Sequence, residues 1–149
     1  MNIEERAAQA AAWKAAGQCN CAQAVALAFA DECGCGSDFM FRAASAFGGG
    51  MCRMREVCGA LSGAMIVIGL IYGEGNEREH EIKKALYARG QAIFAGFRDE
   101  LGTVVCRELL SPAEGAGNAP DARGGDYYKR RPCSKIVHFT ADLLSEHLG

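Results

Sequence analysis

The chain has 149 residues, half of them hydrophobic, and carries 16 basic and 18 acidic side chains for a formal net charge of −2. A domain of this length buries roughly 70% of the surface that its unfolded chain would expose, so it can fold without disulfides. These values exclude a small disulfide-stabilised scaffold, and the dispersed charges give no basic patch for a nucleic-acid partner.

Alanine-rich stretches with three-to-four residue spacing recur along the chain, whereas strand-like alternation is scarce. The sequence therefore predicts an all-α fold, a compact bundle of about six or seven helices in a single helical domain that spans residues 1–149. The most apolar helix, expected at 55–72, should lie at the centre of the bundle.

The first two helices are predicted from glycines and a capping pattern. A first helix is expected over 4–16, closed by Gly17. Asn20 and Gln23 then form a capping-box pattern, which predicts a second helix that runs as far as the CGCG motif at 33–36.

The later helices are expected to start at capping or first-turn residues, which are Ser37, Asn76 with Glu79, Thr103 and Pro132. Glycines 48–50 should end the first of these helices, and Gly102 should end the long second one. The last helix is expected to end near Leu148. The segment 111–126 is rich in Gly, Pro, Asn and Asp, and we expect it to be irregular.

The eight cysteines are the most informative part of the composition. The N-terminal stretch MNIEERAAQAAAWK lacks the basic, apolar and small-residue order of a secretory signal, so we expect a cytoplasmic protein. In that reducing compartment cysteines remain thiols, which favours metal, cluster or redox chemistry. The uncharged segment 57–72 would span roughly 24 Å as a helix, and we expect no membrane span.

Four cysteines share a position near a predicted helix N-terminus: Cys21, Cys58, Cys106 and Cys133. Free backbone N–H groups and the helix dipole lower the pKa of a cysteine there and favour the thiolate, which binds metals and attacks disulfides. Each of the four lies on an apolar stripe, so we expect them to point inward. The alternative is that they are inert, buried hydrophobic residues.

A small-residue face stands beside Cys58, formed by Gly59, Ser62 and Gly63. Such a face lets the backbone of another helix approach closely, and that helix could bring its own thiol within ligand distance. The same face would permit a helix-mediated homodimer. The alternative is close helix packing without any chemistry.

The remaining cysteines are Cys19, Cys33, Cys35 and Cys52. Two C-x-C pairs, 19/21 and 33/35, suggest a zinc or copper(I) site. However, a helix between the pairs would separate them by roughly 18 Å, which argues against a shared site. We expect Cys35 and Cys52 to be accessible thiols outside the main set, although either could exchange with a member of it.

Two further patterns have weaker functional interpretations. The GGGMCRMR stretch at 48–55 could cradle a phosphate with its glycines and two arginines, but its spacing matches neither a P-loop nor a dinucleotide motif. We interpret it as a connection between helices. The histidines His80, His138 and His147 are expected on the surface, although His138 could replace a cysteine ligand.

Four stretches carry a family resemblance: CNCAQAVALAFA, FGGGMCRMREVCGALSGAMIVIGLIYG, CRELL and RPCSKIVHFTADLL. Over about residues 17–148 the chain resembles the C_GCAxxG_C_C family of redox-active proteins, whose CGAxxG motif is met by Cys58, Gly59, Ala60 and Gly63. The resemblance implies a helical domain with four signature cysteines, which correspond to Cys21, Cys58, Cys106 and Cys133. A related domain in a cytochrome implies that they hold an iron–sulfur cluster of the [2Fe-2S] type.

Three functions follow from these residues. The first is a small redox protein in which the four signature cysteines hold the cluster for electron transfer or redox sensing, with a separate redox partner protein. The second is a metal-free thiol–disulfide oxidoreductase or sensor. The third is a structural zinc site or a helical interaction module. The four additional cysteines depart from the family pattern, and Cys19 could replace Cys21 as a ligand.

Overall fold

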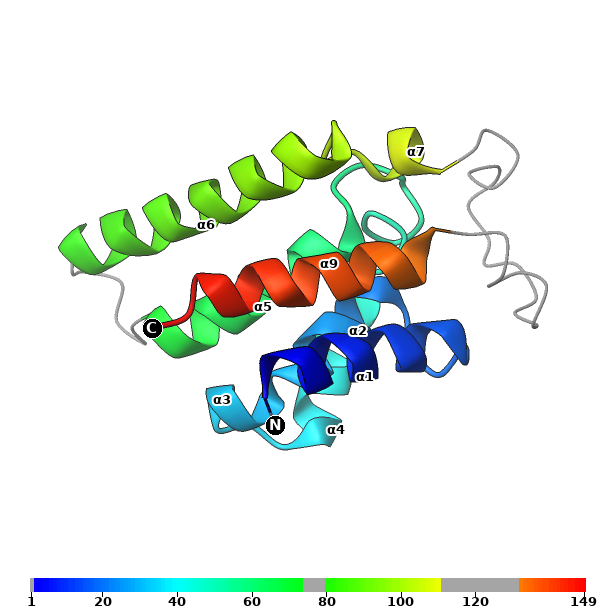
Figure 1. Ribbon diagram of the computed structural model, residues 1–149. Coiled ribbons are helices and arrows are strands. Elements are labelled where there is room, and N and C mark those ends of the chain that lie inside the picture. The colour runs from blue at the N-terminus through cyan, green and yellow to red at the C-terminus, as the bar shows by residue number, and fades with distance from the viewer. Residues whose placement is uncertain (1, 74–79, 111–131) are drawn as a thin grey trace.

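The computed structural model describes residues 2–73, 80–110 and 132–149, and the chain there is mainly helical (Figure 1). Its α-helices are α1 (Ile3–Ala15), α2 (Cys21–Ala28), α3 (Ala30–Cys33), α4 (Ser37–Ala43), α5 (Gly59–Tyr72), α6 (His80–Leu101), α7 (Cys106–Leu109) and α9 (Cys133–Glu146), with a 3-10 turn η1 at Ser45–Phe47. The only extended pairing in these ranges is one antiparallel bridge between Val57 and Val105, so the predicted all-α fold is confirmed.

The apolar helix α5 lies in the middle of the bundle, as predicted. It packs against α2, α6 and α9, while α1 packs along α9 (Figure 1). Leu61 and Val67 of α5 are fully buried in the hydrophobic core, together with Phe97 of α6. The two chain termini and α3 lie at one end of the bundle, and α7 and the start of α9 lie at the other.

Asparagine capping boxes fix the starts of α1 and α2. At α2, the Asn20 side chain accepts a hydrogen bond from the Gln23 N–H at 2.9 Å, and the Gln23 side chain accepts one from the Asn20 N–H at 3.0 Å. This confirms the predicted pattern. Asn2 and Glu5 form the same arrangement at α1. Gly17, which follows α1, has a φ of +76°, a conformation that glycine adopts without strain.

The predicted second helix is divided at Phe29, so the described ranges contain eight α-helices instead of six or seven. The carbonyl of Ala28, the last residue of α2, accepts a hydrogen bond from Arg6 Nη1 at 2.6 Å. The Arg6 guanidinium lies 5.1 Å from the centroid of the buried Phe29 ring. A contact from α1 therefore accompanies the break, and no local sequence signal predicts it.

The predicted start of the central helix is wrong. Helix α5 begins at Gly59, with Cys58 as its N-cap, and the prediction began it at residue 55. Residues 55–58 pair with 104–107 instead: the Cys58 N–H donates to the Val104 carbonyl at 2.9 Å. This pairing joins segments far apart in the chain, and it keeps residues 55–58 out of the helix.

Two predicted caps are also wrong. Gly36 is the N-cap of α4 in place of Ser37, and Val105 is the N-cap of α7 in place of Thr103. The Thr103 hydroxyl accepts a hydrogen bond from the Val105 N–H at 3.1 Å and donates one to Glu108 at 2.6 Å. Thr103 therefore braces the turn before α7 without capping the helix.

The last predictions concern the helix ends. Helix α6 ends at Leu101 before Gly102, as predicted, while α9 ends at Glu146 and has Pro132 as its N-cap. The cap at Asn76 with Glu79 and the irregular segment 111–126 lie outside the described residues. In the ranges that the structure describes, none of the helices combines the length and the apolar character needed to cross a membrane.

Candidate cysteine-lined site

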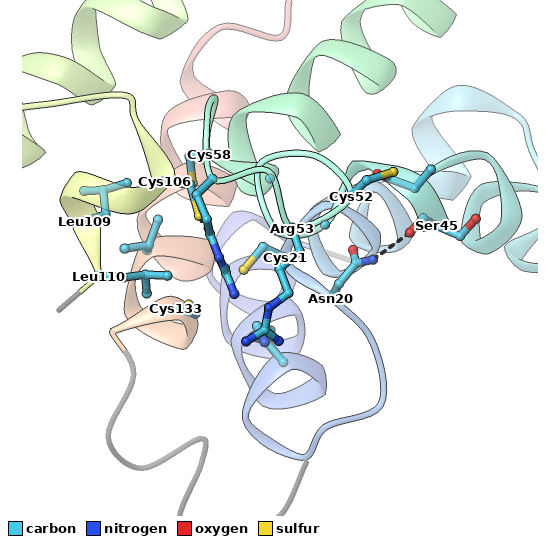
Figure 2. Close-up of a pocket in the computed structure, with 17 residues that line it drawn as sticks. Asn20, Cys21, Ser45, Cys52, Arg53, Cys58, Cys106, Leu109, Leu110 and Cys133 are labelled. Atoms are coloured by element: carbon cyan, nitrogen blue, oxygen red, sulfur yellow. Dashed lines mark hydrogen bonds between the residues drawn. The ribbon is translucent and has the colours of Figure 1, made fainter. Parts of the chain in front are cut away.

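Cysteines from four separate elements line one cavity of about 310 Å³ (Figure 2). They are the four that the sequence places near helix N-termini: Cys21, Cys58, Cys106 and Cys133. Cys58 is the N-cap of α5, and the other three are the first residues of α2, α7 and α9. The cavity lies at the end of the bundle where α7 and α9 begin. The fold thus brings the four predicted site residues together.

The extended segments before α5 and α7 place Cys58 beside Cys106. The Cys106 N–H donates to the Glu56 carbonyl, and the Arg107 N–H donates to the Arg55 carbonyl at 3.3 Å. The Arg107 side chain also donates from Nε to the Arg55 carbonyl at 3.0 Å. The two thiols therefore lie on neighbouring stretches of backbone that are joined by hydrogen bonds.

Glycines allow the segments that form the cavity wall to pack closely against one another. A Cβ added at Gly59 would lie 3.4 Å from the Cys21 Cβ, and one added at Gly50 would lie 2.7 Å from the Cys106 Cβ. At Gly63 an added Cβ would lie only 2.5 Å from the Ala22 carbonyl oxygen. The predicted small-residue face of α5 is thus a close contact with α2, the helix that carries Cys21.

The pKa values of two cavity thiols are higher than the helix-terminus argument predicts. Burial raises the pKa of Cys58 to about 12, although the N–H groups of Ala60 and Leu61 act to lower it. A hydrogen bond with Cys133, followed by burial, raises the pKa of Cys21 well above its usual range. The predicted lowering is therefore wrong for these two thiols, because burial and thiol contact outweigh the helix N-terminus.

Three buried cations share the cavity with the thiols: Lys14, Arg53 and Arg55. Arg55 Nη1 donates a hydrogen bond to Cys106 Sγ at 3.7 Å. The sequence pointed to the two arginines only through the phosphate interpretation of GGGMCRMR, and it gave no indication that Lys14 faces the thiols. Lys14 stands in the last turn of α1, where a charge opposite in sign to the helix dipole is ordinary.

The thiols are reduced, and they do not form a ready-made metal site. All eight cysteines lie in the described ranges, and none of them forms a disulfide. Within those ranges no three His, Cys, Asp or Glu side chains form a group that could hold a metal ion. The cavity therefore collects the thiols without placing three of them around one ion.

The family model described as "Putative redox-active protein (C_GCAxxG_C_C)" matches residues 19–147. The chain belongs to this family. A search of curated proteins gave no match, and a search of solved structures also gave none. The span that matches the C_GCAxxG_C_C family contains all eight cysteines, so the match alone does not say which of them act together.

The structure separates the additional cysteines of this C_GCAxxG_C_C protein from the four in the cavity wall. Cys19 is buried but does not line the cavity, whereas Cys21 does. Cys52 is exposed at the cavity edge, near Ser45, and its thiol donates to the Ala46 carbonyl at 3.3 Å (Figure 2). The predicted accessibility of Cys52 is confirmed.

The second C-x-C pair lies elsewhere in the fold. Cys33 Sγ is 3.8 Å from the carbonyl of Val67, which belongs to the C-terminal half of α5. Cys35 Sγ is 3.6 Å from the Cys33 carbonyl. Cys21 lies beside the opposite end of α5, where a Cβ added at Gly59 would be 3.4 Å from the Cys21 Cβ. The geometric argument against one site shared by the two C-x-C pairs is therefore supported.

His138 does not reach the cysteine cavity. Its side chain is about half exposed, and its Nδ1 lies 3.3 Å from Asp142 Oδ2, one helical turn along α9. Both residues line a separate surface hollow with Ser134 and Phe139. His138 therefore does not replace a cysteine in the wall of the cavity.

Proposed function

We propose that the protein is a small redox protein in which Cys21, Cys58, Cys106 and Cys133 hold an iron–sulfur cluster of the [2Fe-2S] type. The observation that carries the proposal is the cavity itself, because four thiols from α2, α5, α7 and α9 line one space of about 310 Å³. Thiolates are the preferred ligands of iron–sulfur clusters, and the family is redox-active. When bound, such a cluster supplies one-electron transfer, for electron carriage or redox sensing.

Electrostatic coupling among the cavity thiols supports one shared site. Cys133, through a hydrogen bond, and Cys58 both act to raise the pKa of Cys21, and Cys106 and Cys133 both act to raise the pKa of Cys58. A [2Fe-2S] cluster takes two cysteines on each iron, whereas structural zinc needs four ligands around one centre. Loading has to draw the sulfurs into bonding positions, since no described group of three is preformed.

The charges in the wall also suit a cluster. Four thiolates carry more negative charge than a buried cavity can hold without compensation. Lys14, Arg53 and Arg55 supply three positive charges, and Arg55 already donates to Cys106 Sγ. These side chains would stabilise the bound thiolates, and the burial of Cys58 would keep water from its sulfur.

The test is to prepare the protein without oxygen and reconstitute it with iron and sulfide. We expect a coloured protein with about two irons and two labile sulfides per chain. Changing any one of the four cavity cysteines to serine should lower the iron content to less than about half, because an alkoxide is a poor substitute for thiolate. The matched control is Cys52→Ser, which removes an exposed thiol at the edge of the same cavity and should leave the iron content unchanged.

Two results would contradict the cluster. One is a colourless protein that contains zinc, or no metal, even after reconstitution. The other is an iron content that falls equally in Cys52→Ser and in the four cavity variants, since iron would then be bound by thiols without regard to position.

One observation favours a second function, a metal-free thiol–disulfide exchange centre. The Cys21 and Cys133 thiols are in hydrogen-bonding contact, so they could form a disulfide while a substrate disulfide is reduced to two thiols. The raised pKa of Cys21 works against this function, because the attacking species is the thiolate. Peptide mapping after mild oxidation would support it by finding a Cys21–Cys133 disulfide that a thiol reductant cleaves, and would exclude it by finding none.

A further inference from the structure

The cysteine cavity has a strongly cationic wall. Lys14, Arg53 and Arg55 all line it, with exposed fractions of 4%, 8% and 8%. No Asp or Glu is among the described residues that line the same space. Three buried positive charges on the described part of the wall favour an anion in this space.

Arg55 has hydrogen-bonding capacity that its surroundings leave unused. Its Nη1 donates to a sulfur, a weak acceptor, at 3.7 Å. Its Nε is buried and has no hydrogen-bond partner among the residues that the structure describes. A buried guanidinium donor without an acceptor is costly, so such a group in a cavity wall suggests a role in binding.

The backbone holds this arginine in place before any ligand arrives. Arg53 and Arg55 both have a φ of +62°, a left-handed conformation that is unfavourable for residues with a Cβ. Hydrogen bonds across the loop maintain it: the Arg55 N–H donates to the Gly49 carbonyl at 3.0 Å, and the Arg107 side chain clamps the Arg55 carbonyl. A donor fixed in this way loses little entropy when it binds a ligand.

We propose that this cationic wall is a binding site for a small tetrahedral oxyanion of the sulfate or phosphate class, beside the thiols. The planar guanidinium donates to two oxygens of such an anion at once, and a buried lysine adds charge without geometric demand. The site goes beyond the proposed cluster and does not need iron. The GGGMCRMR stretch would thus bind an oxyanion after all. The binding groups would be its arginine side chains, in place of the backbone of its glycines.

The experiment uses the full chain, metal-free and reduced, in isothermal titration calorimetry. Sulfate, inorganic phosphate and glycerol phosphate are titrated separately, with chloride holding the ionic strength constant. We expect saturable binding at one site per chain. Arg55→Gln should weaken it by about tenfold or more, since a charge-assisted hydrogen bond is lost. Arg55→Lys, which keeps the charge but not the fork, should give an intermediate value. The matched control is Arg42→Gln, which removes an exposed charge on α4 and should change nothing.

Binding of glycerol phosphate alone would support the site and assign it to a phosphate ester, whereas binding of the inorganic ions would assign it to the free oxyanion. The proposal is overturned if none of the three anions binds saturably to the wild-type protein, or if Arg42→Gln weakens binding as much as Arg55→Gln. Should Arg55→Gln fail to fold by circular dichroism, Arg53→Gln takes its place. A negative result here leaves the cluster untouched, because the iron content is measured on separate, reconstituted protein.

Discussion

At the end of the bundle that holds the chain termini, the buried Arg6 guanidinium is surrounded by acceptors. Its Nη1 donates to the Ala28 carbonyl at 2.6 Å and to Asp31 Oδ1 at 2.5 Å, and its Nη2 donates to Asp31 Oδ2 and Glu32 Oε1. At the opposite end, Arg55 has a thiol as acceptor for one nitrogen and none for its Nε. The first arginine joins helices α1 and α3, whereas the second faces a cavity with its donors incompletely used.

The same contrast runs along α5, the helix that connects the two ends. Near the cavity, Gly63 lies against the backbone of α2, so closely that a Cβ would be 2.5 Å from the Ala22 carbonyl oxygen. Six residues later, Gly69 has nothing within 4 Å of an added Cβ. The cavity end is therefore packed to position Cys21, which precedes Ala22, while the other end of α5 has room to spare.

The largest effect should come from changing these two glycines to alanine. Gly63→Ala forces α2 away from α5 and should lower the free energy of unfolding by about 2–3 kcal/mol. Gly69→Ala should leave it unchanged or raise it by up to ~1 kcal/mol, because alanine is the better helix former and the space is open. Urea unfolding of the reduced, metal-free protein measures both.

Gly63→Ala should also lower the iron content of reconstituted protein, because the displaced backbone of α2 carries Cys21. Equal free energies of unfolding for Gly63→Ala and Gly69→Ala would show that the contact between Gly63 and Ala22 does not constrain the cavity. The two ends of α5 would then not differ in how closely they are packed.

The next largest effect is expected at the end of the bundle that holds Arg6. Arg6→Met leaves the Ala28 carbonyl without its donor and removes the pair with Asp31, and it should destabilise the protein by about 2 kcal/mol. The control is Arg42→Met, since the side chain of Arg42 is 80% exposed and lies 3.8 Å from Asp38. That exposed pair should contribute less than about 0.5 kcal/mol. A comparable loss in both variants would mean that Arg6 does not join the helices as described.

The contribution of Arg6 to the free energy of unfolding should decrease as the pH falls. The hydrogen bond from Arg6 holds the pKa of the Asp31 carboxyl below its usual range in the folded protein. The resulting stability is present above the unfolded pKa and is lost as the pH falls through the folded value. The difference between wild type and Arg6→Met should therefore narrow below about pH 4. Because the Asp31 side chain is 60% exposed, the narrowing should be less than ~1 kcal/mol in urea unfolding at pH 7 and pH 3.

Local signals in the sequence predicted much of the fold. The capping box at Asn20, the end of α6 before Gly102 and the central position of α5 all depend on residues close together in the chain, and all three are confirmed. The start of α5 at Gly59 was missed because residues 55–58 pair with a segment about fifty residues away. No local propensity encodes that pairing.

In the candidate site, too, features set by neighbouring residues were predictable, and features set by contacts between distant segments were not. The positions of the four cysteines near helix starts were predictable, because caps and thiols are adjacent in sequence. The pKa values of Cys21 and Cys58 were not, since burial and contact between thiols from different helices decide them. The cationic wall was equally hidden, because Lys14 comes from α1 and the arginines come from the loop before α5.

The smallest effect is expected from the C-x-C pair at the end opposite the cavity. Burial raises the pKa of Cys33 to about 11, and the Cys33 and Cys35 thiols lie against the carbonyls of Val67 and Cys33. A serine hydroxyl can donate to the same carbonyls, so Cys33→Ser and Cys35→Ser should each change the free energy of unfolding by less than about 1 kcal/mol. The iron and labile sulfide of reconstituted protein should stay at the wild-type level. A loss of iron in either variant as large as that in Cys58→Ser would contradict the placement of the cluster in the cavity, because Cys33 and Cys35 lie at the other end of α5.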